Sequence, residues 1–233
     1  MSFSFVEKRN VITPDVSALE NLIAFMTKLK LYSNHKKPLM ILGPSGVGKD
    51  TMINMLKDKY PNVFFKLPSY TTRAKRPGET EGVDYFFVSE EEFKKMESQG
   101  KLFGFQKYNN NYYASNRSKL RELIDTGDKI IILNYNIETA NCVKNEFDFN
   151  YVAILPPSEG ELKNRLINRG TKPEEIEKRM ENSIREINLI NEANYIQFRV
   201  VNNEINECFT KLDNHIKELY PQFFLSYRQV TNL

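Results

Sequence analysis

The sequence predicts an α/β protein in which a parallel sheet is flanked by helices. Three observations indicate this class. The apolar run Leu39–Leu42 is typical of a buried strand, and it leads into a glycine-rich turn that should open a helix. Short strand-like runs recur along the chain, and amphipathic helical patterns separate them. Strands that alternate with helices form parallel sheets, which bind ligands at the carboxyl ends of their strands.

The composition is that of one globular core with small insertions. The chain has 233 residues, of which 40% are hydrophobic and 27% charged. Its net charge of +3, without a block of basic residues, gives no support for a nucleic-acid partner. No apolar run approaches the roughly 20 residues that cross a bilayer, and we see no signal-peptide core, so we expect a cytoplasmic protein without a membrane partner. Cys142 and Cys208 lack metal spacing, and we expect both to be small apolar side chains in helices.

Residues 1–36 precede the first strand and are expected to form an N-terminal extension. Within it, Pro14–Leu31 carries an apolar stripe, and Ser17 and Glu20 offer a capping box, which together predict one helix. Such a stripe more often packs on its own domain, and a dimer contact is the alternative. A monomer and a homodimer therefore both remain open.

The remaining elements are expected in alternation. The helix after the glycine-rich turn should end near Tyr60, because Pro61 cannot continue it. Further strands are expected at Val63–Leu67, Tyr85–Val88, Ile130–Leu133, Tyr151–Leu155 and Phe198–Val201. Serine caps, terminal glycines and apolar stripes predict helices after Ser89, over Arg117–Thr126, after Ser158, after Pro173 and over Asn203–Leu219. The segment from about Pro68 to Ser115 interrupts the alternation and is expected to be a small β-rich insertion.

The turn Gly43-Pro44-Ser45-Gly46-Val47-Gly48-Lys49 has the pattern of a phosphate-binding loop. Its glycines let successive backbone N–H groups surround a polyphosphate, and the N-terminus of the next helix adds positive potential. Lys49 should reach the terminal phosphates, so we expect a nucleoside triphosphate. A Ser or Thr usually follows this lysine and contacts magnesium, whereas here Asp50 takes that place and Thr51 comes next. We expect Asp50 and Thr51 to serve Mg²⁺, since a carboxylate can bind the ion through water.

A second anion site is predicted in the insertion. Its residues fall in three runs, Ser69-Tyr70-Thr71-Thr72-Arg73-Ala74-Lys75-Arg76-Pro77-Gly78-Glu79, Gly82-Val83-Asp84-Tyr85-Phe86-Phe87-Val88 and Asn111-Tyr112-Tyr113-Ala114-Ser115. Arginine forks match phosphate oxygens, while phenols and hydroxyls fix the position of the group. Beside a phosphate-binding loop, this set favours a phosphate-monoester site over a solvated basic loop.

These motifs resemble those of the guanylate kinase family over about Lys37 to Leu219. The resemblance implies a P-loop nucleoside monophosphate kinase fold, with ATP and GMP as substrates and Mg²⁺ as cofactor. It implies a core (37–68, 116–157 and 196–220), a GMP-binding insertion (69–115), a lid (158–195) and a tail (221–233). It also implies that the GMP phosphate is held by Ser69, Arg73, Arg76, Tyr85 and Tyr113, with Ser115 beside the guanine.

The resemblance assigns the lid arginines as well. Arg165 and Arg169 lie one helical turn apart and share a helix face, and Arg179 follows. By the family pattern these three residues, together with Arg73 and Lys49, carry the catalysis, because phosphoryl transfer depends on positioning and on cationic stabilisation. Asn202 matches a position near the donor adenine, and capping of the last helix is its alternative role.

Three further positions depart from the family pattern, near the purine or near the metal and phosphates. Gly104 aligns with a glutamate that reads guanine, and Asn134 and Asn136 align with two acidic residues. Asn136 stays a predicted GMP ligand, because its amide oxygen can still accept, and Gln106 or Glu138 could replace the missing acid. The loss of a hydrogen bond to a charged group costs roughly 1.5–3 kcal/mol, or about ten- to a hundredfold in discrimination.

Two other functions remain open. A kinase of a sugar phosphate such as a pentose phosphate would share the loop and need no glutamate for guanine, although the complete arginine and tyrosine set argues against it. A non-catalytic, guanylate-kinase-like binding module is the second alternative. The intact glycines and Lys49 argue against this module, because such modules usually have a degraded loop.

Overall fold

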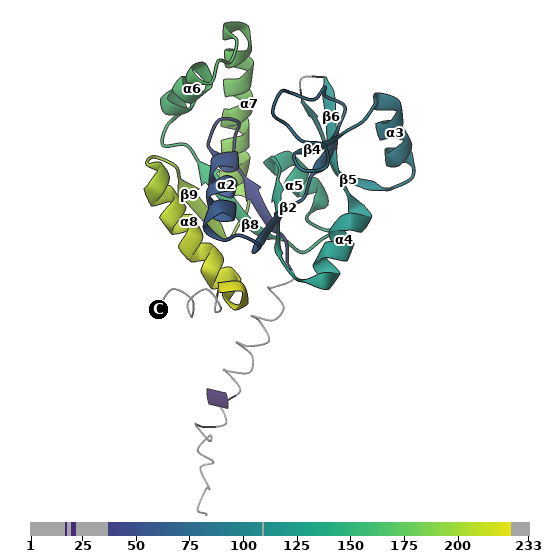
Figure 1. Ribbon diagram of the computed structural model, residues 1–233. Coiled ribbons are helices and arrows are strands. Elements are labelled where there is room, and N and C mark those ends of the chain that lie inside the picture. Colours follow the sequence, from purple (N-terminus) through teal and green to yellow (C-terminus); the bar gives the residue numbers. More distant parts are fainter. Residues whose placement is uncertain (1–16, 18–19, 22–36, 109, 225–233) are drawn as a thin grey trace, which may run out of the picture.

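The structure is a computed structural model that describes residues 17, 20, 21, 37–108 and 110–224. Most of the helix predicted at 14–31 and the tail from residue 225 lie outside the described residues. The core is a five-stranded parallel sheet in the order β2-β7-β1-β8-β9 (Figure 1). These strands span Phe64–Lys66, Ile130–Asn134, Leu39–Leu42, Asn150–Leu155 and Phe198–Val201. The predicted α/β class with a helix-flanked parallel sheet is confirmed.

The central strand β1 divides the hydrophobic core into two layers. Leu39 and Ile41 belong to one buried cluster and Met40 and Leu42 to the other, because successive side chains of a strand point to opposite faces. The first layer includes α2 (Lys49–Lys59), α6 (Glu159–Asn168), α7 (Pro173–Glu192) and α8 (Ile205–Leu219). The second includes α4 (Arg117–Thr126), α5 (Ile137–Val143) and the end of α7.

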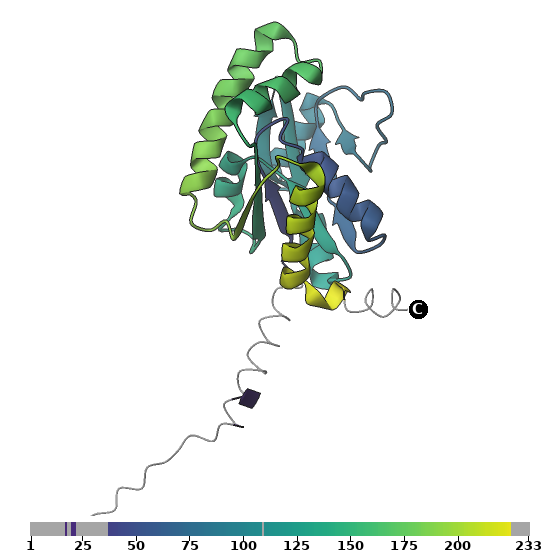
Figure 2. The ribbon, with the colours of Figure 1, turned by 90° about the vertical axis from the view of Figure 1, so that its left-hand side faces the viewer.

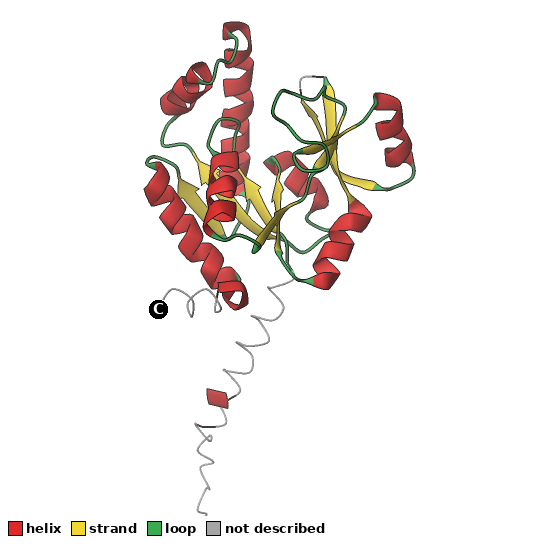
Figure 3. Ribbon diagram, in the orientation of Figure 1, coloured by secondary structure: helices red, strands yellow, loops and turns green. Residues whose placement is uncertain are grey.

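The β-rich insertion forms a separate sheet of four strands in the order β4-β3-β6-β5 (Figure 3). Its strands are β3 (Ser69–Thr71), β4 (Tyr85–Phe87), β5 (Leu102–Tyr108) and β6 (Asn111–Asn116), and α3 (Glu90–Ser98) lies between β4 and β5 in the chain. Phe93 of α3 packs with Leu102 and Ala114 and so covers one face of this sheet. The other face, which carries Ser69 and Ser115 as a register pair, is turned toward the core.

Most predicted boundaries agree with the structure to within one or two residues. Strands β1 and β9 and helix α4 have the predicted bounds, and the hydroxyls of Ser89 and Ser158 cap α3 and α6. Both cysteines lie in helices as expected, with Cys208 buried on α8 and Cys142 exposed on α5. Within the described part of the chain, no helix has the length and apolar character needed to span a bilayer.

The elements that follow the core strands lie on two sides of the loop after β1. In Figures 1 and 2, α6 and the adjoining part of α7 lie on one side and the four-stranded sheet lies on the other.

At the opposite end of the molecule, Phe224 is buried against Tyr60, with ring centroids 4.9 Å apart. The start of the predicted tail is therefore part of the core packing.

Candidate active site

The turn between β1 and α2 needs glycine for both conformation and space. Gly43, Gly46 and Gly48 have φ angles of 142°, 84° and 104°, which side chains rarely adopt. A Cβ on Gly43 would lie 2.3 Å from the carbonyl oxygen of Ile154, and one on Gly48 would lie 2.7 Å from Nδ2 of Asn202. The turn, which also contains Pro44, Ser45 and Val47, is thus pressed against the ends of the neighbouring strands. This is the conformation that a phosphate-binding loop requires.

Gly43→Ala should lower stability and ATP affinity together. The new Cβ would meet a backbone carbonyl at 2.3 Å, so the loop must shift, at a cost of about 1–3 kcal/mol for the strained backbone alone. Gly78→Ala is the matched control, since Gly78 also has a positive φ of 85°, but a Cβ there would have no atom of the described residues within 4 Å. Thermal unfolding and ATP titration measure both effects. An equal loss in the two variants would show that the contact with Ile154 is unimportant.

Lys49 folds back over this loop. Its ammonium donates to the carbonyl oxygen of Gly43 and, at 3.1 Å, to that of Pro44. Burial lowers the pKa of Lys49, the charges of Glu186 and Asp50 oppose this, and the charge of Arg169 adds to it. A desolvated ammonium near a second cation gains free energy when an anion binds. Lys49 and Arg169 are therefore placed to hold a polyphosphate.

Asp50 is bound by two neighbouring side chains. Its Oδ1 accepts hydrogen bonds from Nζ of Lys66 at 3.2 Å and from Nδ2 of Asn134 at 3.1 Å. Desolvation opposes ionisation of Asp50, but Lys66, Lys49 and Asn134 together outweigh it and hold the pKa of Asp50 below its ordinary value. Asn134 at the end of β7 thus donates to the carboxylate of Asp50 on α2. Thr51, which follows Asp50 in the chain, is exposed.

Glu186 on α7 is a site residue that the sequence analysis missed. Its carboxylate accepts a hydrogen bond from the backbone N–H of Ile137 at 3.3 Å. Burial raises the pKa of Glu186 to about 7. The charge of Lys49 opposes this rise, and the charge of Glu138 adds to it. One signal was available, because Glu186 lies between the buried Ser183 and Ile190 on the inner face of α7.

The titration of Glu186 predicts a stability that depends on pH. The folded state holds this proton up to about pH 7, whereas the unfolded chain releases it near the ordinary value of 4.5. The free energy of unfolding should therefore fall as the pH rises between these values. Glu186→Gln stays neutral, so it should match the wild type near pH 4.5 and exceed it by about 1–3 kcal/mol above pH 7.

Denaturant titrations between pH 4.5 and pH 8 measure this difference. Glu181→Gln is the control, because Glu181 is exposed on the same helix. A difference between Glu186→Gln and the wild type that is constant over this range would contradict the assignment.

The inner face of the four-stranded sheet collects the predicted phosphate ligands. Arg73 forms a bidentate ion pair with Glu79, with nitrogen–oxygen distances of 3.0 and 2.7 Å. Its guanidinium lies 5.3 Å from the ring centroid of Tyr85, whose ring is 5.9 Å from that of Tyr113. Glu79 also accepts from the backbone N–H of Arg76, whose side chain is exposed. The structure thus groups Arg73, Tyr85 and Tyr113, with Arg76 in the adjoining turn.

A hydroxyl cluster lies on the same face. Ser69 Oγ and Ser115 Oγ are 3.1 Å apart, and the buried hydroxyl of Tyr135 donates to Ser115 at 2.6 Å. Gly104 has a φ of 68°, and a Cβ there would lie 2.6 Å from the Tyr135 hydroxyl oxygen. The ring of Tyr135 therefore fills the space of a side chain at position 104. Asn136 caps α5 by accepting from the N–H of Thr139 at 2.9 Å.

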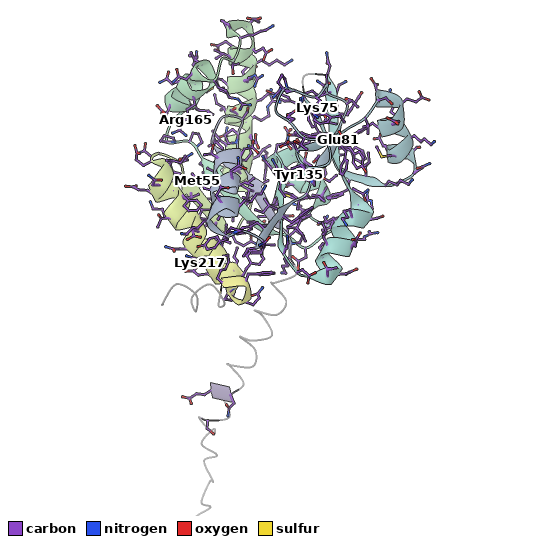
Figure 4. The ribbon with its side chains drawn as sticks, viewed as in Figure 1. Met55, Lys75, Glu81, Tyr135, Arg165 and Lys217 are labelled. Atoms are coloured by element: carbon purple, nitrogen blue, oxygen red, sulfur yellow. The ribbon has the colours of Figure 1, made fainter. Side chains whose placement is uncertain are left out.

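The predicted lid arginines contact both other parts of the site. Arg165 donates to the backbone oxygen of Asn202 at 2.9 Å, and Asn202 Nδ2 donates to the oxygen of Val47 at 2.8 Å. Capping by Asn202 is wrong, because α8 begins after Glu204. Arg179 pairs with Glu175 and lies 5.3 Å from the ring centroid of Tyr108 on β5. In Figure 4, Arg165 lies on the side of α6, whereas Lys75 and Glu81 lie on the side of the four-stranded sheet, with Tyr135 below them.

Comparisons with known proteins agree on one family. The family model for guanylate kinase matches residues 35–219. A guanylate kinase of Clostridium perfringens is 35% identical over 187 residues, which cover 79% of this chain and 84% of that protein. One from Clostridium tetani is 38% identical over 180 residues, covering 76% and 84%. The crystal structure of guanylate kinase from Anaplasma phagocytophilum aligns with a TM-score of 0.60 and 26% identity, over 78% of this chain and 85% of that one.

Proposed function

The chain belongs to the guanylate kinase family, and on this premise we propose that it transfers the γ-phosphoryl group of ATP to GMP, giving ADP and GDP. One observation carries the proposal beyond family membership. Asn134 at the end of β7 donates to Asp50, which follows Lys49, and Tyr135, the next residue, donates to Ser115 on the sheet face that holds Tyr85 and Tyr113. These two contacts support the proposal, because the proposed donor and acceptor sites would adjoin at two consecutive residues.

The donor and acceptor would be held by groups of different kinds. Backbone N–H groups of residues 43–49 and the ammonium of Lys49 bind the ATP phosphates. Arg73 gives up its bidentate contact with Glu79 to bind the phosphate of GMP, while Tyr85 and Tyr113 donate hydroxyl hydrogen bonds to it. Charge on the transferring group is spread over its oxygens, so Arg165, Arg169 and Arg179 stabilise it by position and charge.

The reaction needs no residue as general base. A phosphate monoester has its second pKa near 6, so the attacking oxygen of GMP is already largely ionised at pH 7. That oxygen forms a bond to the γ-phosphorus, the bond from this phosphorus to the β–γ bridging oxygen breaks, and ADP leaves with the electron pair. Arg179 of the lid contacts the ring of Tyr108 on the acceptor sheet. Contact of this kind between the lid and the sheet would keep water out of the site during transfer.

The residues around Asp50 fit a magnesium ion that is bound together with ATP. The carboxylate of Asp50 is ionised and has Oδ2 outside the two hydrogen bonds that reach Oδ1. Among the described residues no group of three His, Cys, Asp or Glu side chains could hold a metal alone. Mg²⁺ commonly binds through one or two carboxylates and the substrate phosphates, so Asp50, with Thr51 beside it, would hold it there. When bound, the ion neutralises phosphate charge.

Nucleotides are the proposed partners, and the cytoplasm is the proposed compartment. All residues assigned above come from one chain, so a monomer would be competent and a homodimer is not required. The decisive assay is ADP formation from ATP with GMP, AMP, UMP or a pentose phosphate as acceptor. Turnover with GMP supports the proposal, whereas turnover with the pentose phosphate and none with GMP would replace it. Failure to bind ATP in calorimetry with magnesium would instead favour a non-catalytic module.

A further inference from the structure

The side-chain amide of Gln106 on β5 has an unused hydrogen-bond donor. Its Nε2 is buried and has no partner among the described residues. A buried donor without a partner costs roughly 1–3 kcal/mol, so each such group in a folded protein needs a specific explanation, and an acceptor supplied by a bound molecule is one. Gln106 therefore marks a position where a bound molecule would supply an acceptor.

The register of the sheet shows which way Gln106 points. Gln106 is directly opposite Tyr113, so the two side chains share a face, and Ser115 lies two residues further along β6 on that same face. The opposite face is covered by Phe93 of α3. A long side chain reaches a diagonal neighbour about 7–8 Å away. Gln106 thus borders the strip of β6 that runs from the phosphate ligand Tyr113 to the hydroxyl of Ser115.

The hydroxyl cluster at the end of this strip also offers a donor. Burial raises the pKa of Tyr135, so its hydroxyl keeps its proton and donates it to Ser115 at 2.6 Å. Ser115 therefore accepts from Tyr135 and has its own proton to donate to Ser69 or to a ligand. A carbonyl oxygen of the ligand would accept this proton, while an amino group in the same place would put donor against donor.

An anionic acceptor is missing from this strip. Strands β3, β4, β5 and β6, all within the described residues, contain no Asp or Glu. Position 104 has no room for a side chain because the ring of Tyr135 lies there, and Asn136 uses its Oδ1 on the cap of α5. The 2-amino group of guanine is a pure donor, so it meets no charged acceptor from these strands.

We propose that Gln106 and Ser115 read the 6-oxo and N1 edge of the acceptor purine, and that the 2-amino group is not read. The amide of Gln106 donates to O6 or accepts from N1–H, and Ser115 donates to O6. The acceptor class is therefore 6-oxopurine nucleoside monophosphates, with GMP and inosine monophosphate (IMP) as near-equal substrates. This inference rests on the proposed function and narrows its substrate class.

Steady-state kinetics with GMP, IMP and AMP test the substrate class. The values of kcat/KM for GMP and IMP should agree to within about fivefold, because no charged hydrogen bond worth ten- to a hundredfold distinguishes them. The kcat/KM for AMP should be at least about a hundredfold lower, since the 6-amino group of AMP is a donor and would face the donor hydroxyl of Ser115.

Variants of Gln106 test the residue itself. Gln106→Ala should raise the KM for GMP and for IMP by a similar factor, about tenfold, with the KM for ATP unchanged. Gln106→Glu introduces a carboxylate that accepts from N1–H and the 2-amino group, so the ratio of GMP to IMP efficiency should rise at least about tenfold. Lys107→Ala is the matched control, because Lys107 pairs with Tyr112 on the opposite face.

Two results would overturn the inference in distinguishable ways. A wild type that prefers GMP to IMP by more than about a hundredfold, with Gln106→Ala unchanged in this ratio and in KM, contradicts the inference and leaves the kinase intact. An absence of turnover with GMP, IMP and AMP, in a protein that unfolds cooperatively, removes the proposed function and the inference with it.

Discussion

Lys49→Ala is expected to reduce phosphoryl transfer by at least about 10²–10³-fold while the protein stays folded. Among the described residues, Lys49 donates only to carbonyls of its own loop, and its desolvated ammonium lies near the cation Arg169. Removing the Lys49 side chain should therefore leave the packing of the core intact. The free energy of unfolding should fall by less than about 1 kcal/mol or increase. The loss should appear in kcat and in ATP affinity, because in the proposed mechanism the ammonium binds phosphates in the ground state and during transfer.

The matched control is Lys57→Ala, an exposed lysine on the same helix. It should leave ADP formation and the melting temperature unchanged. Single-turnover measurements with saturating ATP separate binding from chemistry in Lys49→Ala. Activity retained within about tenfold of the wild type would mean that the terminal phosphates bind elsewhere, and the donor site would have to be reassigned.

The core could be predicted well because its signals are local. The runs Leu39–Leu42 and Ile130–Leu133 are continuously apolar, and they can be recognised without knowledge of their neighbours in the sheet. Strands β5 and β6 could not be predicted individually. They are rich in Tyr and Asn, and their pairing shifts register between Phe103 and Gln106, so no strict alternation of polar and apolar residues is visible. The short helix α5 was expected only as a helix around Cys142, without bounds, because it lacks a long periodic stretch.

The residues of the candidate site could be predicted where they belong to a contiguous sequence motif. Contacts between segments that are distant in the sequence could not be predicted. The glycine loop and the arginine and tyrosine runs are visible in the sequence. The bond from Asn134 to Asp50 joins residues 84 positions apart, and Glu186 approaches Lys49 only after α7 has packed. These tertiary contacts explain two departures from the family pattern. Asn134 is the donor that a carboxylate at position 50 requires, and the ring of Tyr135 takes the space at Gly104.

Arg73→Ala is the second substitution with a large expected effect. The guanidinium can offer the acceptor phosphate the two parallel hydrogen bonds that it now makes with Glu79, each worth roughly 1.5–3 kcal/mol. The KM for GMP should therefore rise about a hundredfold or more, while the KM for ATP stays within about twofold. Initial rates with one substrate varied at saturating levels of the other measure the two constants separately.

Glu79→Gln is the complementary variant, because it weakens the competitor and keeps an acceptor for the N–H of Arg76. A partly exposed ion pair of this kind contributes about 0.2–1 kcal/mol, so releasing Arg73 should lower the KM for GMP by up to about fivefold. The two variants thus move the same constant in opposite directions, which a general loss of structure cannot do. If Arg73→Ala raises both KM values equally, Arg73 serves the fold of the sheet and the acceptor phosphate binds elsewhere.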